Sequence, residues 1–142
     1  MQINLLQLKD FTITKLSINF LRTRKKPENV IYNLDVNTDH KRDRNNKRLH
    51  VVQLKVSVTP EPRFGYKIQA NISGKFMAPD GISEKVLNEL IPSNGTLILY
   101  GILRGQLALF TSSFPGGRIT LPTIPIKCPN PTDLVKKSVK RS

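Results

Sequence analysis

The sequence predicts a single-domain α+β fold, in which a four-stranded antiparallel sheet is backed by a short and a long helix. Two observations carry this prediction. Apolar and polar residues alternate in four segments between residues 7 and 76, and after residue 81 the period changes to that of a helix. The chain has 142 residues, of which 38% are hydrophobic. That length is typical of one domain with one core.

The first two strands are expected over 7–20 and 32–36. In the first, Phe11 and Ile13 alternate with polar residues, and the alternation resumes at Leu16 after the phase slips at Thr14-Lys15. Such a slip indicates a β-bulge. The second strand is expected to lie between Pro27 and the polar run 37–46.

The third and fourth strands show the clearest period of two, over 52–58 and 66–76. Residues 59–65 contain two prolines, which lack the N–H that a ladder needs, so this segment is expected to be a hairpin connection. Four sequential strands with short or polar connections imply an antiparallel meander with one buried face.

Two helices are expected after the sheet. A short amphipathic helix starts near Ser83 and stops at Pro92, and a longer one, capped by Ser93 or Asn94, runs to Phe110. The longer helix is apolar nearly all round, which favours burial against a second protomer. The predicted oligomer interface comprises Gly101, Gly105, Ile102 and Leu109. The two glycines would allow close helix approach or, equally, make room for a bulky side chain of the same chain. Gly116-Gly117 is expected to form a turn after the helix.

The charge is strongly basic: 23 Lys and Arg against 10 Asp and Glu give a net charge of +13. Basic residues cluster in three segments, at 22–26, at 41–48 and at 136–141. The middle cluster forms a predicted basic patch of Lys41, Arg42, Arg44, Lys47 and Arg48. Such clusters attract nucleic acid, anionic membrane surfaces or acidic polypeptides, and they also keep an oligomer soluble.

No catalytic or metal-binding pattern is present in the sequence, so we expect neither an enzyme nor a cofactor or metal site. His40 and His50 flank the basic segment without metal-ligand spacing and are expected to be solvated loop residues. The single cysteine, Cys128, cannot form an intrachain disulfide. No apolar run is long enough to span a bilayer, and no signal peptide is recognisable. We therefore expect a cytoplasmic location and no membrane insertion.

A series of short motifs resembles the SecB family of export and holdase chaperones. The motifs are Asn33-Leu34-Asp35-Val36-Asn37-Thr38, the strand 52–59, Ile72-Ser73-Gly74-Lys75-Phe76, Leu99-Tyr100-Gly101, Phe114-Pro115 and Leu121-Pro122-Thr123-Ile124. None is specific alone, but together they keep the family's order over most of the chain. The resemblance implies one SecB-like domain over 1–128, followed by a basic tail over 129–142.

What the resemblance implies is an ATP-independent chaperone that binds unfolded or aggregation-prone polypeptides and assembles as a dimer of dimers. Its clients would be exported proteins or a dedicated partner such as an antitoxin. The implied client-binding groove comprises Leu34, Phe76, Leu99, Tyr100, Ile119, Leu121 and Ile124.

Two departures from the family make delivery to the translocation motor SecA doubtful. Better-known members are acidic, and here Pro129-Asn130-Pro131 interrupts the place of their last helix. The alternative function is a nucleic-acid-binding module whose three cationic segments converge on one face. A third hypothesis assigns the positive charge to an acidic protein partner.

Overall fold

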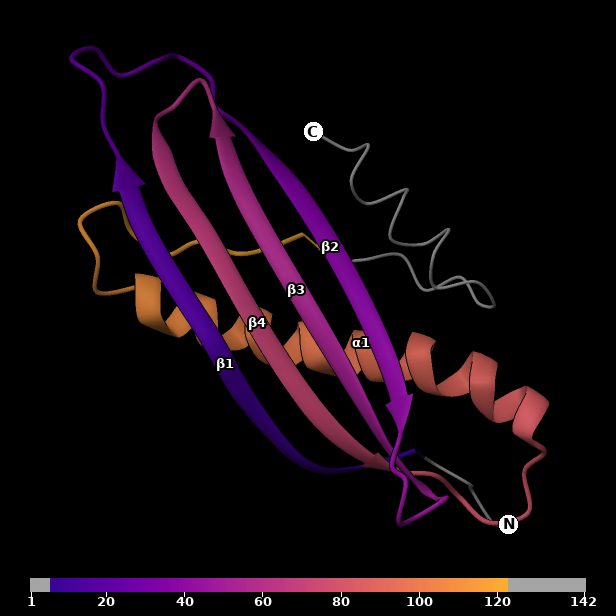
Figure 1. Ribbon diagram of the computed structural model, residues 1–142. Coiled ribbons are helices and arrows are strands. Elements are labelled where there is room, and N and C mark those ends of the chain that lie inside the picture. The colour runs from indigo at the N-terminus through magenta and orange to yellow at the C-terminus, as the bar shows by residue number, and fades with distance from the viewer. Residues whose placement is uncertain (1–5, 123–142) are drawn as a thin grey trace, which may run out of the picture.

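The computed structural model describes residues 6–122 (Figure 1). Four strands come first: β1 (Gln7–Leu21), β2 (Ile31–Arg42), β3 (Leu49–Glu61) and β4 (Gly65–Met77). One helix, α1 (Glu84–Thr111), follows them. The predicted α+β fold with a four-stranded antiparallel sheet is therefore confirmed.

The order of the strands across the sheet is β1-β4-β3-β2, with every neighbouring pair antiparallel. Strands β2, β3 and β4 follow one another as a meander, but β1 lies beside β4 and not beside β2. The predicted four-strand meander is therefore wrong, and the sheet has a Greek-key order. Residues 22–30 cross one end of the sheet to connect β1 with β2 (Figure 1). This connection is too long for a tight hairpin, which leaves β1 free to pair elsewhere.

Strand β1 pairs with β4 because their apolar residues then share one face. Phe20 lies opposite Tyr66 and Ile18 opposite Ile68 in the register. The register shifts once between Ile13 and Lys15, which confirms the predicted bulge, and once more between Leu8 and Asp10. Each bulge restores the phase, so the apolar residues of β1 stay on the face that carries the core.

Two strands are longer than predicted. Strand β2 continues to Arg42 through residues expected to be a loop, and β3 continues through Pro60 to Glu61. The β3–β4 register ends at the Val58–Ile68 pair, so only β2 accompanies Pro60. A proline is tolerated there because one side of the strand has no ladder at that position.

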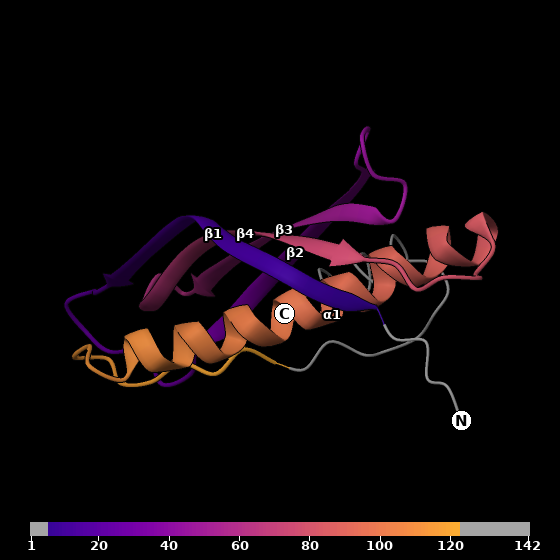
Figure 2. The same cartoon turned by 90° about the horizontal axis from the view of Figure 1, so that it is seen from below.

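The core lies between α1 and one face of the sheet (Figure 2). α1 packs mainly against β3, β4 and β2. The core side chains alternate along the central strands, as the sequence predicts: Val52, Leu54, Val56 and Val58 on β3, and Tyr66, Ile68, Ala70, Ile72 and Phe76 on β4. Burial of this apolar surface is the main stabilising contribution to such a fold.

The predicted short and long helices form one helix that runs through Pro92, which corrects the two-helix prediction. Ser83 is its N-cap and accepts a hydrogen bond from the Val86 N–H at 3.4 Å. The buried face continues across the proline, from Leu87 and Ile91 to Leu99. Packing of this continuous face outweighs the lost backbone hydrogen bond at Pro92. Among residues 6–122, no helix combines the length and apolarity that crossing a membrane requires.

After α1 the chain turns and returns along the helix. Gly117 has a φ of 79° in the predicted turn, which favours glycine. The returning segment is held by Tyr100, whose hydroxyl donates to the Pro122 carbonyl at 2.6 Å, and by Arg104, whose Nε donates to the Leu121 carbonyl at 2.8 Å. These bonds fix residues 117–122 against α1.

Candidate functional site

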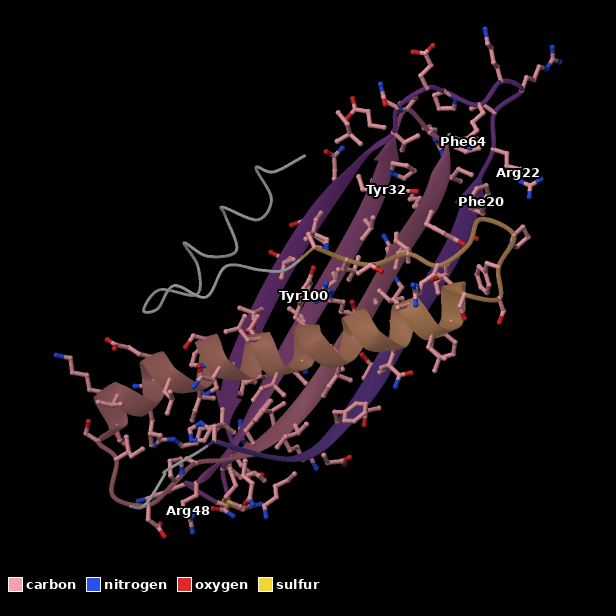
Figure 3. The ribbon with its side chains drawn as sticks, turned by 180° about the vertical axis from the view of Figure 1, so that it is seen from behind. Phe20, Arg22, Tyr32, Arg48, Phe64 and Tyr100 are labelled. Atoms are coloured by element: carbon pink, nitrogen blue, oxygen red, sulfur yellow. The ribbon has the colours of Figure 1, made fainter. Side chains whose placement is uncertain are left out.

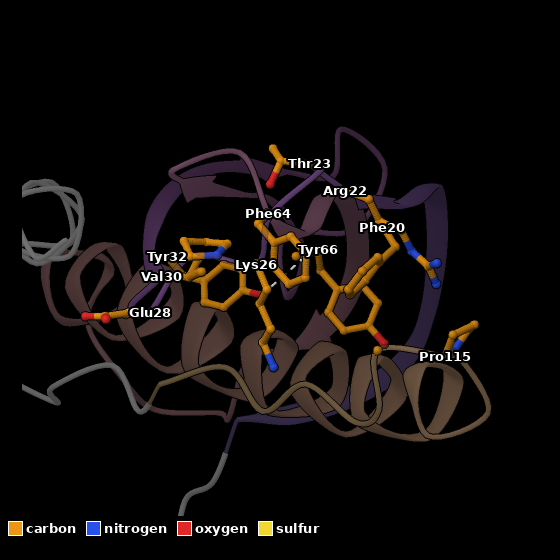
Figure 4. A pocket seen from close by; sticks show the side chains of 13 residues that line it. Phe20, Arg22, Thr23, Lys26, Glu28, Val30, Tyr32, Phe64, Tyr66 and Pro115 are labelled. Carbon is orange, nitrogen blue, oxygen red and sulfur yellow. Dashed lines mark hydrogen bonds between the residues drawn. The ribbon is translucent and has the colours of Figure 1, made fainter.

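A pocket of about 510 Å³ opens at the end of the sheet that the 22–30 connection crosses (Figure 4). Its wall comes from the end of β1, the start of β2, the β3–β4 hairpin and the turn at Pro115 and Gly116. The side chains that define its character are Phe20, Arg22, Lys26, Tyr32, Phe64 and Tyr66. Apolar and polar groups contribute about equally to its walls, and its volume lies in the range of ligand-binding pockets.

Aromatic rings in edge-to-face contact form the floor of the pocket. The ring centroid of Phe20 lies 5.6 Å from that of Phe64 and 5.2 Å from that of Tyr66. Phe114 extends the cluster, with its centroid 6.2 Å from that of Tyr66. Rings at these distances stabilise one another, and they offer apolar surface to a bound side chain.

Two tyrosines and one glycine fix the geometry of this floor. The Tyr66 N–H donates to the Tyr32 hydroxyl at 3.2 Å, and the Tyr66 hydroxyl donates to the Gly117 carbonyl. Burial, with a smaller contribution from Tyr32, raises the pKa of Tyr66, so its hydroxyl stays a donor at neutral pH. Gly65 has a φ of 113°, and a Cβ there would lie 2.2 Å from the Tyr32 hydroxyl oxygen, so only glycine fits.

Charged side chains stand at the rim. The Arg22 guanidinium carbon lies 5.4 Å from the Phe20 ring centroid, a cation–π contact. Lys26 and Glu28 also line the pocket. Figure 4 shows the Arg22 guanidinium at one side of the ring cluster and the Glu28 carboxylate at the other. The pocket thus combines aromatic walls with a cationic rim.

The residues predicted for the groove lie mostly in the core. Phe76 on β4 and Leu99 on α1 are fully buried between the sheet and the helix, and Leu34, Tyr100 and Leu121 are at most 7% exposed. Ile119 is half-buried, and Ile124 lies outside the described residues. Residues 117–122 meet α1 at separate places: the Tyr100 hydroxyl donates to the Pro122 carbonyl, and the Ile119 N–H donates to the Thr111 hydroxyl at 2.9 Å, whereas Leu34 is on β2. Burial raises the pKa of Tyr100 to about 12, although Arg104 opposes the shift. The part of these residues in client binding stays a prediction.

The residues predicted for the oligomer interface lie on α1, and three of the four face outward. A Cβ at Gly101 or Gly105 would meet nothing within 4 Å, so these glycines do not make room for a side chain among residues 6–122. Leu109 is 67% exposed and Ile102 is half-buried. Their role in an interface stays a prediction.

The predicted basic patch lies at the end of the sheet opposite the pocket. Figure 3 shows Arg48 and Arg22 at the two ends. Arg42 forms an ion pair with Glu84 at 2.9 Å, and Arg48 forms one with Asp80 at 3.1 Å. Lys41, Arg44 and Lys47 are exposed. The basic clusters at 22–26 and 41–48 therefore do not converge, and the third cluster lies outside the described residues.

The two histidines are not solvated loop residues, which corrects that expectation. His40 lies on β2 and His50 on β3, diagonally across the ladder, with His40 Nε2 2.9 Å from His50 Nδ1. His50 is fully buried, and its Nε2 has no hydrogen-bond partner in the described part of the chain. Burial is the main cause that lowers the pKa of both imidazoles. In residues 6–122, no three His, Cys, Asp or Glu side chains gather as metal ligands would.

The aromatic cluster is not predicted by any local pattern in the sequence. Its members are spread over four separate segments, and only the fold brings them together. A usable signal is nonetheless present: the chain has six Phe and three Tyr, and Phe20, Tyr32, Phe64 and Tyr66 each stand within two residues of a strand end. Aromatic residues near strand ends come close together when those ends lie at the same end of the sheet.

Comparison with known proteins relates the fold to one kind of chaperone. A similar solved structure is that of the Mycobacterium tuberculosis Rv1957 SecB-like chaperone, in complex with a ChAD peptide from the Rv1956 HigA1 antitoxin. The TM-score is 0.66 at 16% sequence identity, and the match covers 82% of this chain and 89% of that chain. No model of a protein family matches the sequence, and no curated protein does. The chain has a SecB-like fold.

Proposed function

We propose that this protein is an ATP-independent chaperone that binds unfolded or aggregation-prone polypeptides. The observation that carries the proposal is the aromatic pocket at the end of a SecB-like sheet that residues 22–30 cross. We further propose that the protein is not an enzyme, that it works in the cytoplasm, and that its clients are exported proteins or a dedicated partner such as an antitoxin. The peptide complex of the similar chaperone supports a polypeptide as the ligand.

The physical basis of the proposal is nonspecific burial. An apolar wall binds many sequences because each square ångström of apolar surface removed from water contributes about 25 cal/mol. The rings of Phe20 and Phe64 supply such a wall without a shape that selects one side chain. Single contacts of this kind are weak, so a client held at several pockets of one oligomer gains its affinity through avidity.

We place first contact with the client at the pocket, and we propose that the groove continues along residues 117–122. Pro115 and Gly116 line the pocket, and Ile119 and Leu121 follow a few residues later in the chain. The fully buried Phe76 and Leu99 would join this groove only if α1 moved away from the sheet. While α1 stays packed on the sheet, these two side chains therefore stabilise the core and do not contact a client.

For the assembly we propose a homotetramer, a dimer of dimers joined through the outward side of α1. The exposed Leu109, at 67%, and Phe110, at 44%, support this proposal, because neighbouring exposed apolar side chains form a patch of the kind that protein interfaces cover. Gly101 and Gly105 leave open space beside the helix into which a second helix fits. The nucleic-acid alternative gains no support, because the two described basic clusters stand at opposite ends of the sheet. Transfer to SecA stays outside the proposal.

The test is suppression of aggregation of a chemically unfolded client after dilution, without ATP. We expect the wild-type chain to suppress light scattering and Phe64→Ala to need about fivefold more protein, because one ring contributes on the order of 1 kcal/mol in a partly exposed site. Val86→Ala is the matched control, since Val86 is 49% exposed at the other end of the molecule. Phe76→Ala is unsuitable because emptying a core position costs about 3–5 kcal/mol of stability.

Two results would contradict the proposal. One is a wild-type chain that leaves aggregation unchanged at a large molar excess. The other is full activity of a folded double variant, Phe20→Ala with Phe64→Ala, because it would leave the pocket without its two defining phenylalanine rings. Added ATP is expected to change neither the wild-type chain nor the control variant.

A further inference from the structure

The charge around the aromatic pocket is unbalanced. The 22–30 connection carries Arg22, Arg24, Lys25 and Lys26 against Glu28 alone. The β3–β4 hairpin that faces it adds Arg63, together with Glu61, whose carboxylate accepts a hydrogen bond from the Asn33 side chain at 3.1 Å. Arg22 and Lys26 themselves line the pocket. Any bound segment therefore meets apolar walls and positive charge together.

These cations are not neutralised within the described part of the chain. The ion pairs among residues 6–122 are Arg42–Glu84 and Arg48–Asp80, and both lie at the opposite end of the sheet. At that end Glu84 and Asp80 each pair with an arginine, whereas Glu28 and Glu61 at the pocket end form no ion pair among the described residues. An excess of unpaired cations beside a concave apolar site raises the local concentration of anionic ligands.

The position of Arg22 makes a carboxylate the fitting partner. Its guanidinium lies 5.4 Å from the Phe20 ring centroid, so the ring holds it at the edge of the apolar floor. A guanidinium presents paired N–H donors that match the two oxygens of a carboxylate. Lys26 adds a second, more mobile positive charge beside the pocket. An apolar side chain in the pocket would bring its acidic neighbours within reach of both.

We propose that the preferred occupant of this pocket is an extended polypeptide segment in which an aromatic or aliphatic side chain is flanked by Asp or Glu. The inference rests on the proposed function, because it names the class of client that this site selects. Phe20, Tyr32 and Phe64 bind the apolar side chain, and Arg22 and Lys26 bind the flanking carboxylates. Basic segments are rejected by the same charges.

The experiment measures binding of dye-labelled peptides to the full-length, nuclease-treated chain by fluorescence anisotropy. Three peptides share one apolar centre and differ only in their flanks, which carry Asp, Asn or Lys. At low salt we expect the Asp peptide to bind about 2- to 30-fold more tightly than the Asn peptide, the range expected for two exposed ion pairs. The Lys peptide is expected to bind more weakly than both, and high salt is expected to reduce the differences.

Charge variants then assign the preference to the pocket. Arg22→Gln with Lys26→Gln is expected to remove most of the advantage of the Asp peptide while leaving the Asn peptide almost unchanged. The matched control is Lys41→Gln with Lys47→Gln, which removes the same charge at the opposite end of the sheet. It is expected to leave the preference intact. Phe64→Ala is expected to weaken the Asp and Asn peptides by the same factor.

Each contrary outcome has a distinct meaning. Equal binding of the Asp and Asn peptides, with both sensitive to Phe64→Ala, would overturn the inference and leave the chaperone proposal standing. A preference that the control variant removes would also overturn the inference. Binding of labelled oligothymidylate more tightly than the Asp peptide, without any effect of Phe64→Ala, would assign the charge to nucleic acid instead. If no peptide binds, the proposed function is refuted, and the inference that rests on it is refuted with it.

Discussion

Gly74 on β4 faces α1 with no room for a side chain, and it gives a sharp test of the packing. A Cβ added there would lie 2.7 Å from Leu99 Cδ2 and 2.9 Å from Phe76 Cε2. Both neighbours are fully buried in the core. Gly74→Ala therefore requires a shift of buried side chains. Gly101→Ala is the matched control, because its Cβ would meet nothing within 4 Å.

The two substitutions are expected to change stability in opposite directions. Overpacking at a buried site costs about 1–3 kcal/mol, of which about 0.4–1 kcal/mol is offset by the reduced entropy of the unfolded chain. Gly74→Ala is thus expected to lower the free energy of unfolding by about 1–2 kcal/mol. Gly101→Ala is expected to raise it by about 0.5–1 kcal/mol, because alanine favours the helix.

Urea denaturation followed by circular dichroism measures both effects. With a slope of about 2 kcal/mol per molar urea, the two midpoints are expected to differ by about 1 M. Each variant is compared with the wild-type chain at one protomer concentration, and its mass is checked on a sizing column, since Gly101 lies in the predicted oligomer interface. Equal midpoints for Gly74→Ala and the wild-type chain would refute the packing argument, as would a reversed order of the two variants.

Three further predictions concern the histidine pair, the proline in α1 and the returning segment. Burial lowers the pKa of His40 and His50, so the unfolded chain binds protons more readily than the folded chain below about pH 6.5. The urea midpoint is therefore expected to fall as the pH is lowered from about 7 to about 5, and to fall less steeply in His50→Leu. Pro92→Ala is expected to raise the free energy of unfolding by about 1–3 kcal/mol in thermal or urea melts, because it restores a helix N–H; an unchanged melt would contradict this. Tyr100→Phe removes the donor to the Pro122 carbonyl and is expected to cost about 0.5–1.5 kcal/mol by the same assay, with no loss if the bond is absent in solution.

The faces of the strands were predictable, but their neighbours were not. The alternation in 52–58 and 66–76 fixes which side chains enter the core, and the phase slip at Thr14-Lys15 locates the bulge. A period of two identifies a face and carries no information on which strand lies alongside, so the placement of β1 next to β4 had to come from the structure.

The helix and the pocket show two other limits of local patterns. Pro92 predicts a helix end by local chemistry, yet the buried face from Leu87 to Leu107 keeps one helix intact. The pocket depends on Phe20, Tyr32 and Phe64, which come from separate strand ends and meet only after folding. Phe76 and Leu99, which were predicted for the groove, lie instead on the apolar faces of β4 and α1, and such faces normally form the core.

The most direct test of the account is photo-cross-linking between the chain and an unfolded client. A photoreactive phenylalanine analogue is placed at position 64 in the pocket or, as a control, at position 86 at the opposite end of the molecule. Irradiation with the unfolded client is expected to yield a cross-linked product from position 64 and little or none from position 86. Equal yields from the two positions, or no product from position 64 while aggregation is still suppressed, would contradict client binding at the aromatic pocket.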